Sequence, residues 1–154
     1  MQPIRRLAFV VNELKAGAAE LAQVLMTAAR RAGVELSHTE HFPLPEDWLK
    51  GFDACCVIGG DGTLLGVVKA AARAQVPVIG VNRGSLGFLT TFSAEEARAH
   101  FTDLLAGSYR IALRSLLDCS TGPGQHDLAL NDVLLKGEIN SRLVRLEVFA
   151  GTSW

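Results

Sequence analysis

Residues 54–65 read ACCVIGGDGTLL, and this stretch decides the fold. It opens with an uninterrupted apolar run, Ala54–Ile58, which is typical of a strand buried on both faces of a parallel sheet. Glycines and an aspartate follow at once, and Leu64–Ala74 then has the composition of a helix. A strand, a tight glycine-rich turn and a helix predict one βα unit of an open parallel sheet.

The segments on either side repeat this alternation. Ser93-Ala-Glu-Glu96 has the form of a capping box, which marks the start of a helix, and Gly33 suits the end of one. The expected flanking elements are strands at Leu7–Val11, Val34–His41 and Val76–Val81, and helices at Ala18–Ala32 and from Ser93 to Leu105. They predict an α/β fold in three layers, a parallel sheet with helices on both faces.

The alternation of strands and helices ends after Gly107. Three strand candidates follow without a helix between them, at Tyr109–Leu117, Leu128–Leu135 and Arg142–Phe149. The segment between the first two, Gly122–His126, is expected to be a mobile surface loop. We therefore expect an α/β nucleotide-binding domain over 1–107 and the first strands of an incomplete all-β domain over 108–154.

Composition excludes several classes of protein. The 154 residues are 49% hydrophobic, which excludes intrinsic disorder, and their net charge of -1 offers no basic field for nucleic acid or a membrane surface. No apolar run is long enough to span a bilayer.

The cysteines are odd in number, and Cys55 and Cys56 are adjacent in an expected strand. This pattern favours cysteines that pack as small core residues in a protein of the reducing cytoplasm. The four histidines lack zinc-ligand spacing, so no metal site is expected among them.

The glycine-aspartate loop, Gly59–Thr63, carries the strongest chemical signal. Glycines let the backbone approach a phosphate closely, and Thr63 is expected to cap the following helix. Asp61 would repel a phosphate unless a metal ion lies between them or unless it accepts a proton, and either role suits phosphoryl transfer. The alternative is a plain strand-to-helix turn in which Asp61 caps the helix.

A second group of residues, Asn82–Phe88, follows the next strand and should lie beside the first loop at the same edge of the sheet. Phe88 could stack on a nucleobase. The alternative, favoured for Phe88 taken alone, is that Leu86, Phe88 and Leu89 are ordinary core side chains.

A third group is the polar pair Asn131-Asp132, which interrupts an apolar run expected to form a strand. Burying such a pair is costly without partners, so it either forms internal hydrogen bonds or faces a ligand such as a ribose and base.

In this order the three groups resemble the NAD kinase family. The matching segments are Gly59–Leu65, Gly80–Thr90 and Ala129–Asp132, with Ser141-Arg142 downstream. The first is shared with diacylglycerol and sphingosine kinases, whereas the second and third are much more specific to NAD kinases.

This resemblance implies an enzyme that phosphorylates the adenosine-ribose 2′-hydroxyl of NAD, using ATP or polyphosphate and a divalent metal such as Mg²⁺. Asp61 matches the catalytic aspartate that accepts the proton of that hydroxyl. By the same resemblance Gly60, Gly62 and Thr63 match the phosphate loop, Phe88 matches a residue lining the adenine site, and Asn131 and Asp132 match the adenosine-binding pair. Family members tend to form homo-oligomers.

Two departures qualify the resemblance. The family usually has Asn-Glu where this chain has Asn131-Asp132, and it continues into a β-rich domain whose Gly-Asp-Gly and Thr-Gly-Ser-Thr-Ala-Tyr stretches are absent here. The chain is therefore expected to be the N-terminal portion of an NAD kinase and to be inactive alone. Two alternatives stay open: a non-catalytic dinucleotide-binding module, and a lipid kinase that shares only the Gly-Gly-Asp-Gly-Thr motif.

Overall fold

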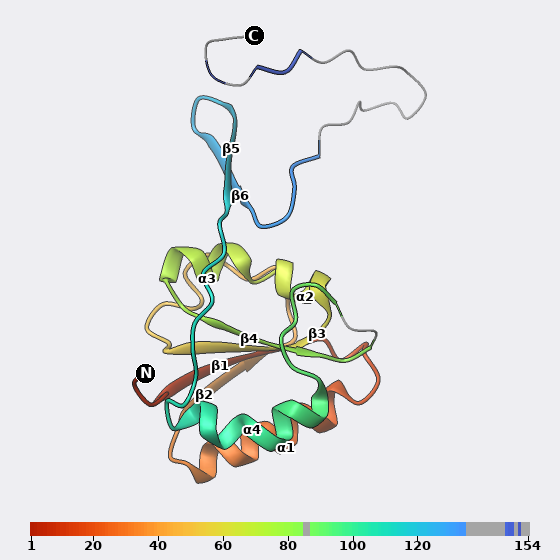
Figure 1. Cartoon of the computed structure of the whole chain (residues 1–154), viewed down its shortest axis with the longest axis vertical. Coiled ribbons are helices and arrows are strands. Elements are labelled where there is room, and N and C mark those ends of the chain that lie inside the picture. Colours follow the sequence, from red (N-terminus) through yellow and green to blue (C-terminus); the bar gives the residue numbers. More distant parts are fainter. Residues whose placement is uncertain (85–86, 135–146, 150, 152–154) are drawn as a thin grey trace.

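A parallel four-stranded sheet with helices on both faces forms the main body of the protein in the computed structural model, which describes residues 1–84, 87–134, 147–149 and 151 (Figure 1). The strand order is β2-β1-β3-β4, and a separate antiparallel pair, β5-β6, follows. The expected α/β class is confirmed. The elements are β1 Arg6–Val11, α1 Ala18–Arg31, β2 Glu35–Thr39, β3 Ala54–Gly59, α2 Asp61–Leu65, α3 Val68–Ala74, β4 Val78–Asn82, α4 Ala94–Leu105, β5 Leu117–Gly122 and β6 Gln125–Ala129.

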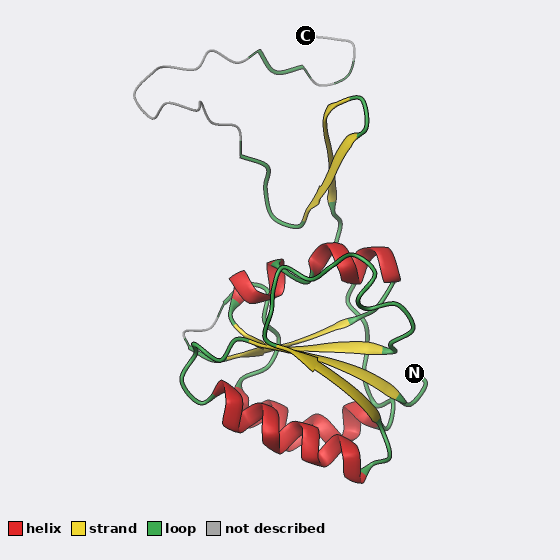
Figure 2. Cartoon of the chain, turned by 180° about the vertical axis from the view of Figure 1, so that it is seen from behind, coloured by secondary structure: helices red, strands yellow, loops and turns green. Residues whose placement is uncertain are grey.

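The two central strands, β1 and β3, are apolar apart from Arg6 at the start of β1, because each of their faces is covered. Alternate residues of β1 point to opposite sides: Phe9 packs in a core shared with α1 and α4, and Val10 in a core shared with α3. Figure 2 shows α1 and α4 together on one face and the two shorter helices on the other. Cys55 and Cys56 are buried in β3, one in each core, as small apolar residues.

The capping box is formed as the sequence predicts. The Ser93 hydroxyl accepts a hydrogen bond from the Glu96 amide at 3.1 Å, and the Ser93 amide donates to Oε2 of Glu96 at 2.8 Å. These hydrogen bonds to Ser93 lower the pKa of the Glu96 carboxyl. The helix that begins here, α4, ends before Gly107, whose φ of 90° is one that residues with a side chain rarely adopt.

The single helix expected over Leu64–Ala74 is instead two helices, α2 and α3, separated at Gly66. The Gly66 carbonyl accepts a hydrogen bond from the Leu44 amide at 2.9 Å, across from the loop that precedes β3. A Cβ on Gly66 would lie 3.2 Å from that of Phe42. The loop therefore packs against the chain at this point and takes a carbonyl that a continuous helix would use.

The expected strand at Tyr109–Leu117 is wrong, since residues 109–116 form no ladder and pairing begins at Leu117. The chain reverses at Pro123-Gly124, where Gly124 has φ 77°, and the residues flanking this turn are the ones that pair. The expected loop is thus the tip of a hairpin. This placement also ends β6 at Ala129, so the predicted strand Leu128–Leu135 is wrong over 130–134.

The last strand candidate, Arg142–Phe149, lies outside the described residues over 142–146, and residues 147–149 are in no strand. The downstream pair Ser141-Arg142 also lies outside them. The hairpin stands beyond α3, on the far side of that helix from the sheet (Figure 1). Across the described ranges, no helix has the length and apolar character needed to cross a bilayer.

Candidate functional site

Three loops leave the carboxyl ends of β1, β3 and β4 at one edge of the sheet, where open α/β sheets bind ligands. The loop after β1 is tied to β3 by a hydrogen bond of 2.9 Å from the Asn12 amide to the Ile58 carbonyl. The loop after β4 is tied to β3 by one of 2.7 Å from the Arg83 amide to the Gly59 carbonyl. The prediction that the first two motifs lie side by side is confirmed.

Asp61 is the first residue of α2, and its carboxylate joins the two motifs. Oδ2 accepts a hydrogen bond from the Phe88 amide at 2.8 Å. Oδ1 accepts from the amides of Leu89 and Thr90 at 3.2 and 3.3 Å. An ionised carboxylate has about four acceptor positions, so with the donors among the described residues one remains, on Oδ2. Asp61 therefore does not cap its own helix, and the plain-turn alternative is wrong in that respect.

The N-cap of α2 is Gly60, with no side-chain cap, so the expected capping by Thr63 is wrong. Thr63 is instead buried inside the helix, and its hydroxyl accepts a hydrogen bond from Nδ2 of Asn12 at 3.1 Å. A Cβ on Gly59 would lie 2.5 Å from that hydroxyl oxygen. Close packing between the end of β3 and the first turn of α2 thus explains both the glycine at position 59 and the burial of Thr63.

The backbone of the glycine-aspartate turn borders open space on one side. A Cβ on Gly60 or on Gly62 would meet no atom of the described residues within 4 Å. A phosphate could therefore approach these two positions without displacing a side chain.

Arg83 fixes the loop after β1, a contact that the sequence analysis missed. Its Nε and one terminal nitrogen donate to the Ala16 carbonyl at 3.0 and 2.6 Å. The guanidinium lies where a side chain on Gly17 would project, and Gly17 has φ 71°. In the sequence, the only local signs of a fixed loop here were Gly17 and the polar pair Asn12-Glu13, which ends the first apolar run.

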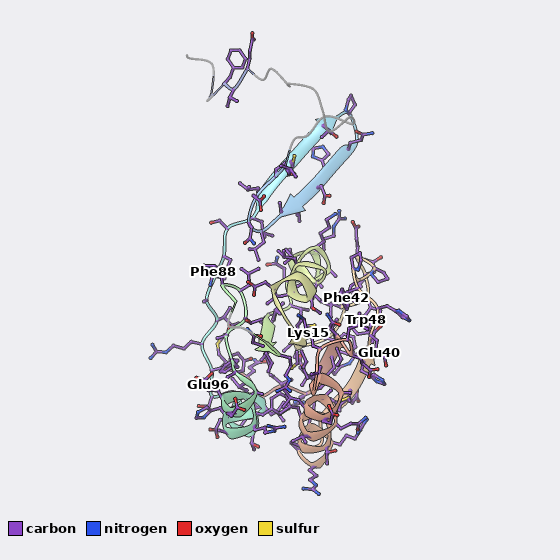
Figure 3. All side chains as sticks on the ribbon, turned by 90° about the vertical axis from the view of Figure 1, so that its right-hand side faces the viewer. Lys15, Glu40, Phe42, Trp48, Phe88 and Glu96 are labelled. Atoms are coloured by element: carbon purple, nitrogen blue, oxygen red, sulfur yellow. The ribbon has the colours of Figure 1, made fainter. Side chains whose placement is uncertain are left out.

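Phe88 is 96% exposed, so its interpretation as a core side chain is wrong (Figure 3). Its neighbour Leu89 is partly buried against the core that includes α3. Thr90 is buried, and its hydroxyl has no hydrogen-bond partner in the structure as described. This segment therefore turns its backbone amides toward Asp61 while its aromatic ring stays at the surface.

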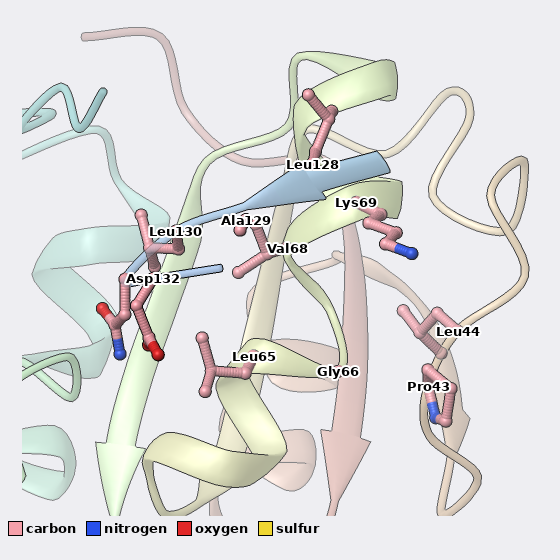
Figure 4. Close-up of a pocket in the computed structure, with 11 residues that line it drawn as sticks. Pro43, Leu44, Leu65, Gly66, Val68, Lys69, Leu128, Ala129, Leu130 and Asp132 are labelled. Carbon is pink, nitrogen blue, oxygen red and sulfur yellow. The ribbon is translucent and has the colours of Figure 1, made fainter. Parts of the chain in front are cut away.

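Asn131 and Asp132 follow β6 and are exposed, so the prediction that they interrupt a strand is wrong. Together with Leu128–Leu130 they line a cleft of about 220 Å³ against the junction of α2 and α3, where Leu65 and Lys69 contribute (Figure 4). Neither Asp61 nor Phe88 belongs to the lining of this cleft.

An ion pair holds the hairpin beside this cleft. Lys69 of α3 pairs with Asp127 of β6, and its hydrogen bond lowers the pKa of the Asp127 carboxyl. The structure thus brings together Asp61, the turn glycines and Phe88, and it positions the polar pair at the other end of α2.

The side chains at the sheet edge suit a metal ion that is bound mainly by substrate phosphates, and they do not suit one held by protein ligands alone. Within the described ranges, no three His, Cys, Asp or Glu residues are grouped to hold a metal ion. Mg²⁺ is commonly held by one or two carboxylates together with substrate phosphates and water, and Asp61 has one free acceptor position. The residues therefore fit a cation that arrives on phosphates and do not form a protein cage. Burial raises the pKa of the Cys55 thiol to about 12, so it is no nucleophile.

Comparisons with known proteins agree with the resemblance of the motifs. Residues 44–109 match the family model described as the ATP-NAD kinase N-terminal domain. An NAD kinase of Clostridium botulinum (strain Loch Maree / Type A3) is 40% identical over 109 residues, which is 68% of this chain and 38% of that relative. An NAD kinase of Pseudomonas paraeruginosa (strain DSM 24068 / PA7) is 43% identical over 102 residues, 63% of this chain and 34% of that relative. The chain thus spans little more than a third of the curated relatives that it matches.

Proposed function

We propose that the protein is a phosphotransferase that makes NADP from NAD, and the premise is the match of residues 44–109 to the ATP-NAD kinase N-terminal domain. The phosphoryl group comes from ATP or polyphosphate, and its acceptor is the 2′-hydroxyl of the adenosine ribose. Relatives named NAD kinase, 40% and 43% identical to this chain, support the proposal.

The single observation that carries the proposal is the arrangement of the Asp61 carboxylate. Three backbone amides orient it at the sheet edge, and one acceptor position on Oδ2 stays open. A ribose hydroxyl is a poor nucleophile at neutral pH, so its attack on a phosphorus atom needs a positioned group to take its proton. Asp61 Oδ2 accepts that proton as the bond from the ribose oxygen to phosphorus forms. The bond from that phosphorus to the donor's bridging oxygen breaks at the same step, which releases ADP or a polyphosphate shortened by one unit.

In this proposal the remaining site residues bind different parts of the substrates. Gly60 and Gly62 offer backbone beside open space to the phosphates, and Thr63 keeps this turn in place through its contact with Asn12. The exposed ring of Phe88 stacks on the adenine. By the resemblance of the motifs, Asn131 and Asp132 bind the adenosine, although the cleft that they line includes neither Asp61 nor Phe88.

A divalent cation such as Mg²⁺ neutralises charge on the transferred phosphoryl group when it is bound. In our proposal it enters with the phosphoryl donor and would be held by the donor's phosphates and water, because the open acceptor position of Asp61 takes the proton of the hydroxyl.

The proposal is tested by measuring NADP formed from NAD, with ATP or polyphosphate as donor, by the intact protein. Asp61→Asn should reduce kcat by about 10²- to 10⁴-fold, the usual contribution of a general base. The matched control is Asp103→Asn, which neutralises an exposed carboxylate on α4 and should leave kcat unchanged. A wild-type protein that binds NAD without forming NADP would support the binding-module alternative instead, and turnover of a lipid would support the lipid kinase.

The 154-residue chain alone is proposed to be inactive, because its polar pair lines a cleft that excludes Asp61. The same assay on this chain measures that directly, and turnover at the rate of the intact protein would contradict it. We also propose a homo-oligomer, from the resemblance, and a cytoplasmic location, from the pattern of cysteines. A division into domains at Gly107 is proposed from the end of the strand–helix alternation there.

A further inference from the structure

Gly87 lies directly against the Asp61 carboxylate. A Cβ on Gly87 would stand 2.2 Å from Oδ1, 2.5 Å from Cγ and 2.6 Å from Oδ2 of Asp61. These separations are far shorter than any contact between non-bonded carbon and oxygen atoms. The carboxylate therefore occupies the volume that any side chain at position 87 would need.

The requirement for glycine here is one of space. All three nearest atoms that a Cβ on Gly87 would meet belong to the Asp61 carboxyl group. The cost of an alanine at position 87 therefore includes a direct overlap with Asp61.

The residues that follow Gly87 complete the contact. The amides of Phe88, Leu89 and Thr90 all donate to the carboxylate, two to Oδ1 and one to Oδ2. Successive amides that converge on one anion form a nest, which fixes the direction in which the anion points. The nest can close on Asp61 only because the residue before it has no side chain.

We propose that Gly87 is a positioning residue that acts through Asp61: the space it leaves lets three amides hold the carboxylate with Oδ2 as the open proton acceptor. The inference rests on the proposed function for the role of that proton, but the contact between Gly87 and Asp61 can be tested without it.

Replacing Gly87 moves the carboxylate and leaves the fold intact. An aspartate side chain rotates about two bonds, so it gives way more easily than the backbone of β4 or α2. In Gly87→Ala the carboxylate swings out of the nest and the three amides lose their acceptor. Catalysis then suffers because the proton acceptor is misplaced, while the phosphate turn itself is unchanged.

The first test follows the amide resonances of Leu89 and Thr90 by NMR in the 154-residue chain. Both lie far enough along the chain from position 87 to report on their acceptor and not on the substitution. Gly87→Ala and Asp61→Ala should each shift these two resonances, and adding Gly87→Ala to Asp61→Ala should shift them no further. The matched control is Gly122→Ala in β5, where a Cβ meets nothing within 4 Å and which should leave both resonances unchanged. Unshifted resonances in Gly87→Ala would overturn the proposal.

The second test compares kcat with KM in the intact protein. Gly87→Ala should reduce kcat by about 100-fold, the size of loss that a misplacement of about 1 Å produces, while KM for the phosphoryl donor stays the same. A wild-type kcat in Gly87→Ala, or a change confined to KM, would contradict a positioning role. A wild-type protein that makes no NADP would overturn the proposed function, and the NMR result would still decide whether Gly87 positions Asp61.

Discussion

At the scale of single residues, the candidate site is held together by polar side chains that bond to the backbone of another loop. Asp61 binds the segment after β4, and Arg83 binds the Ala16 carbonyl in the loop after β1. A hydrogen bond between the side chains of Asn12 and Thr63 joins the loop after β1 to α2. Each contact replaces water at a loop that carries no regular structure, so these few groups determine the shape of the sheet edge.

Arg83→Ala should loosen the loop over residues 12–17, because the Ala16 carbonyl loses two donors from one guanidinium. The loss in free energy of unfolding is expected to be about 1 kcal/mol, since the guanidinium is only partly buried. Hydrogen exchange at the Lys15 and Ala18 amides, which close the turn in this loop, should become faster. Arg98→Ala, on an exposed part of α4, is the control. Unchanged exchange in Arg83→Ala would show that the loop does not depend on this contact.

At the scale of elements, the positions of the strands and of the longer helices are determined by residues within them or next to them. The bounds of the short elements are determined by contacts with other parts of the chain. The helix α4 begins at its capping box and ends at a glycine of positive φ, both of which are visible in the sequence. The break between α2 and α3 arises because the loop at Leu44 packs against Gly66. The pairing of β5 with β6 is decided by the turn at Pro123-Gly124 and not by the apolar run on either side.

Ser93→Ala should lower the free energy of unfolding by about 1 kcal/mol, because the first turn of α4 loses its cap. Part of this stabilisation depends on pH. The pKa of the Glu96 carboxyl lies below its ordinary value of 4.5, so its contribution is complete above that pH and is lost as the pH falls through the lowered value. Urea unfolding at pH 7 and at pH 3 should show a smaller difference between wild type and Glu96→Gln at the lower pH. The control, Glu95→Gln, neutralises a neighbouring carboxylate without touching the Ser93 contact. An equal difference at both pH values would contradict this account.

At the scale of the whole molecule, both cores are built almost entirely from residues before Gly107. Among the described residues, the buried members of each core end at Leu105 or earlier, and only Tyr109 and Leu130 reach a core from later in the chain. Tyr109 also donates a hydrogen bond from its hydroxyl to the Gln2 carbonyl at 3.3 Å. The hairpin is attached to α3 through an exposed ion pair, and such pairs contribute little to stability.

A chain shortened to residues 1–110 should therefore keep its sheet and its cooperative unfolding. Its free energy of unfolding is expected to fall by no more than about 1 kcal/mol, because among the described residues it loses one partly buried leucine and no fully buried core residue. Urea unfolding followed by circular dichroism, alongside the 154-residue chain, measures the difference. A loss of several kcal/mol, or a broad transition, would contradict the proposed domain division at Gly107.

The sequence by itself determined the alternation of strands and helices, the order of the motifs along one edge and the cap of α4. These features depend on apolar periodicity and on backbone preferences within a few residues. Only the tertiary structure decided that Asp61 is held by amides 27 to 29 residues away, that Arg83 reaches a carbonyl 67 residues earlier, and that Gly87 leaves room for a carboxylate. Such contacts depend on which strands are neighbours and in what register, because side chains distant in the chain meet only after the sheet has formed.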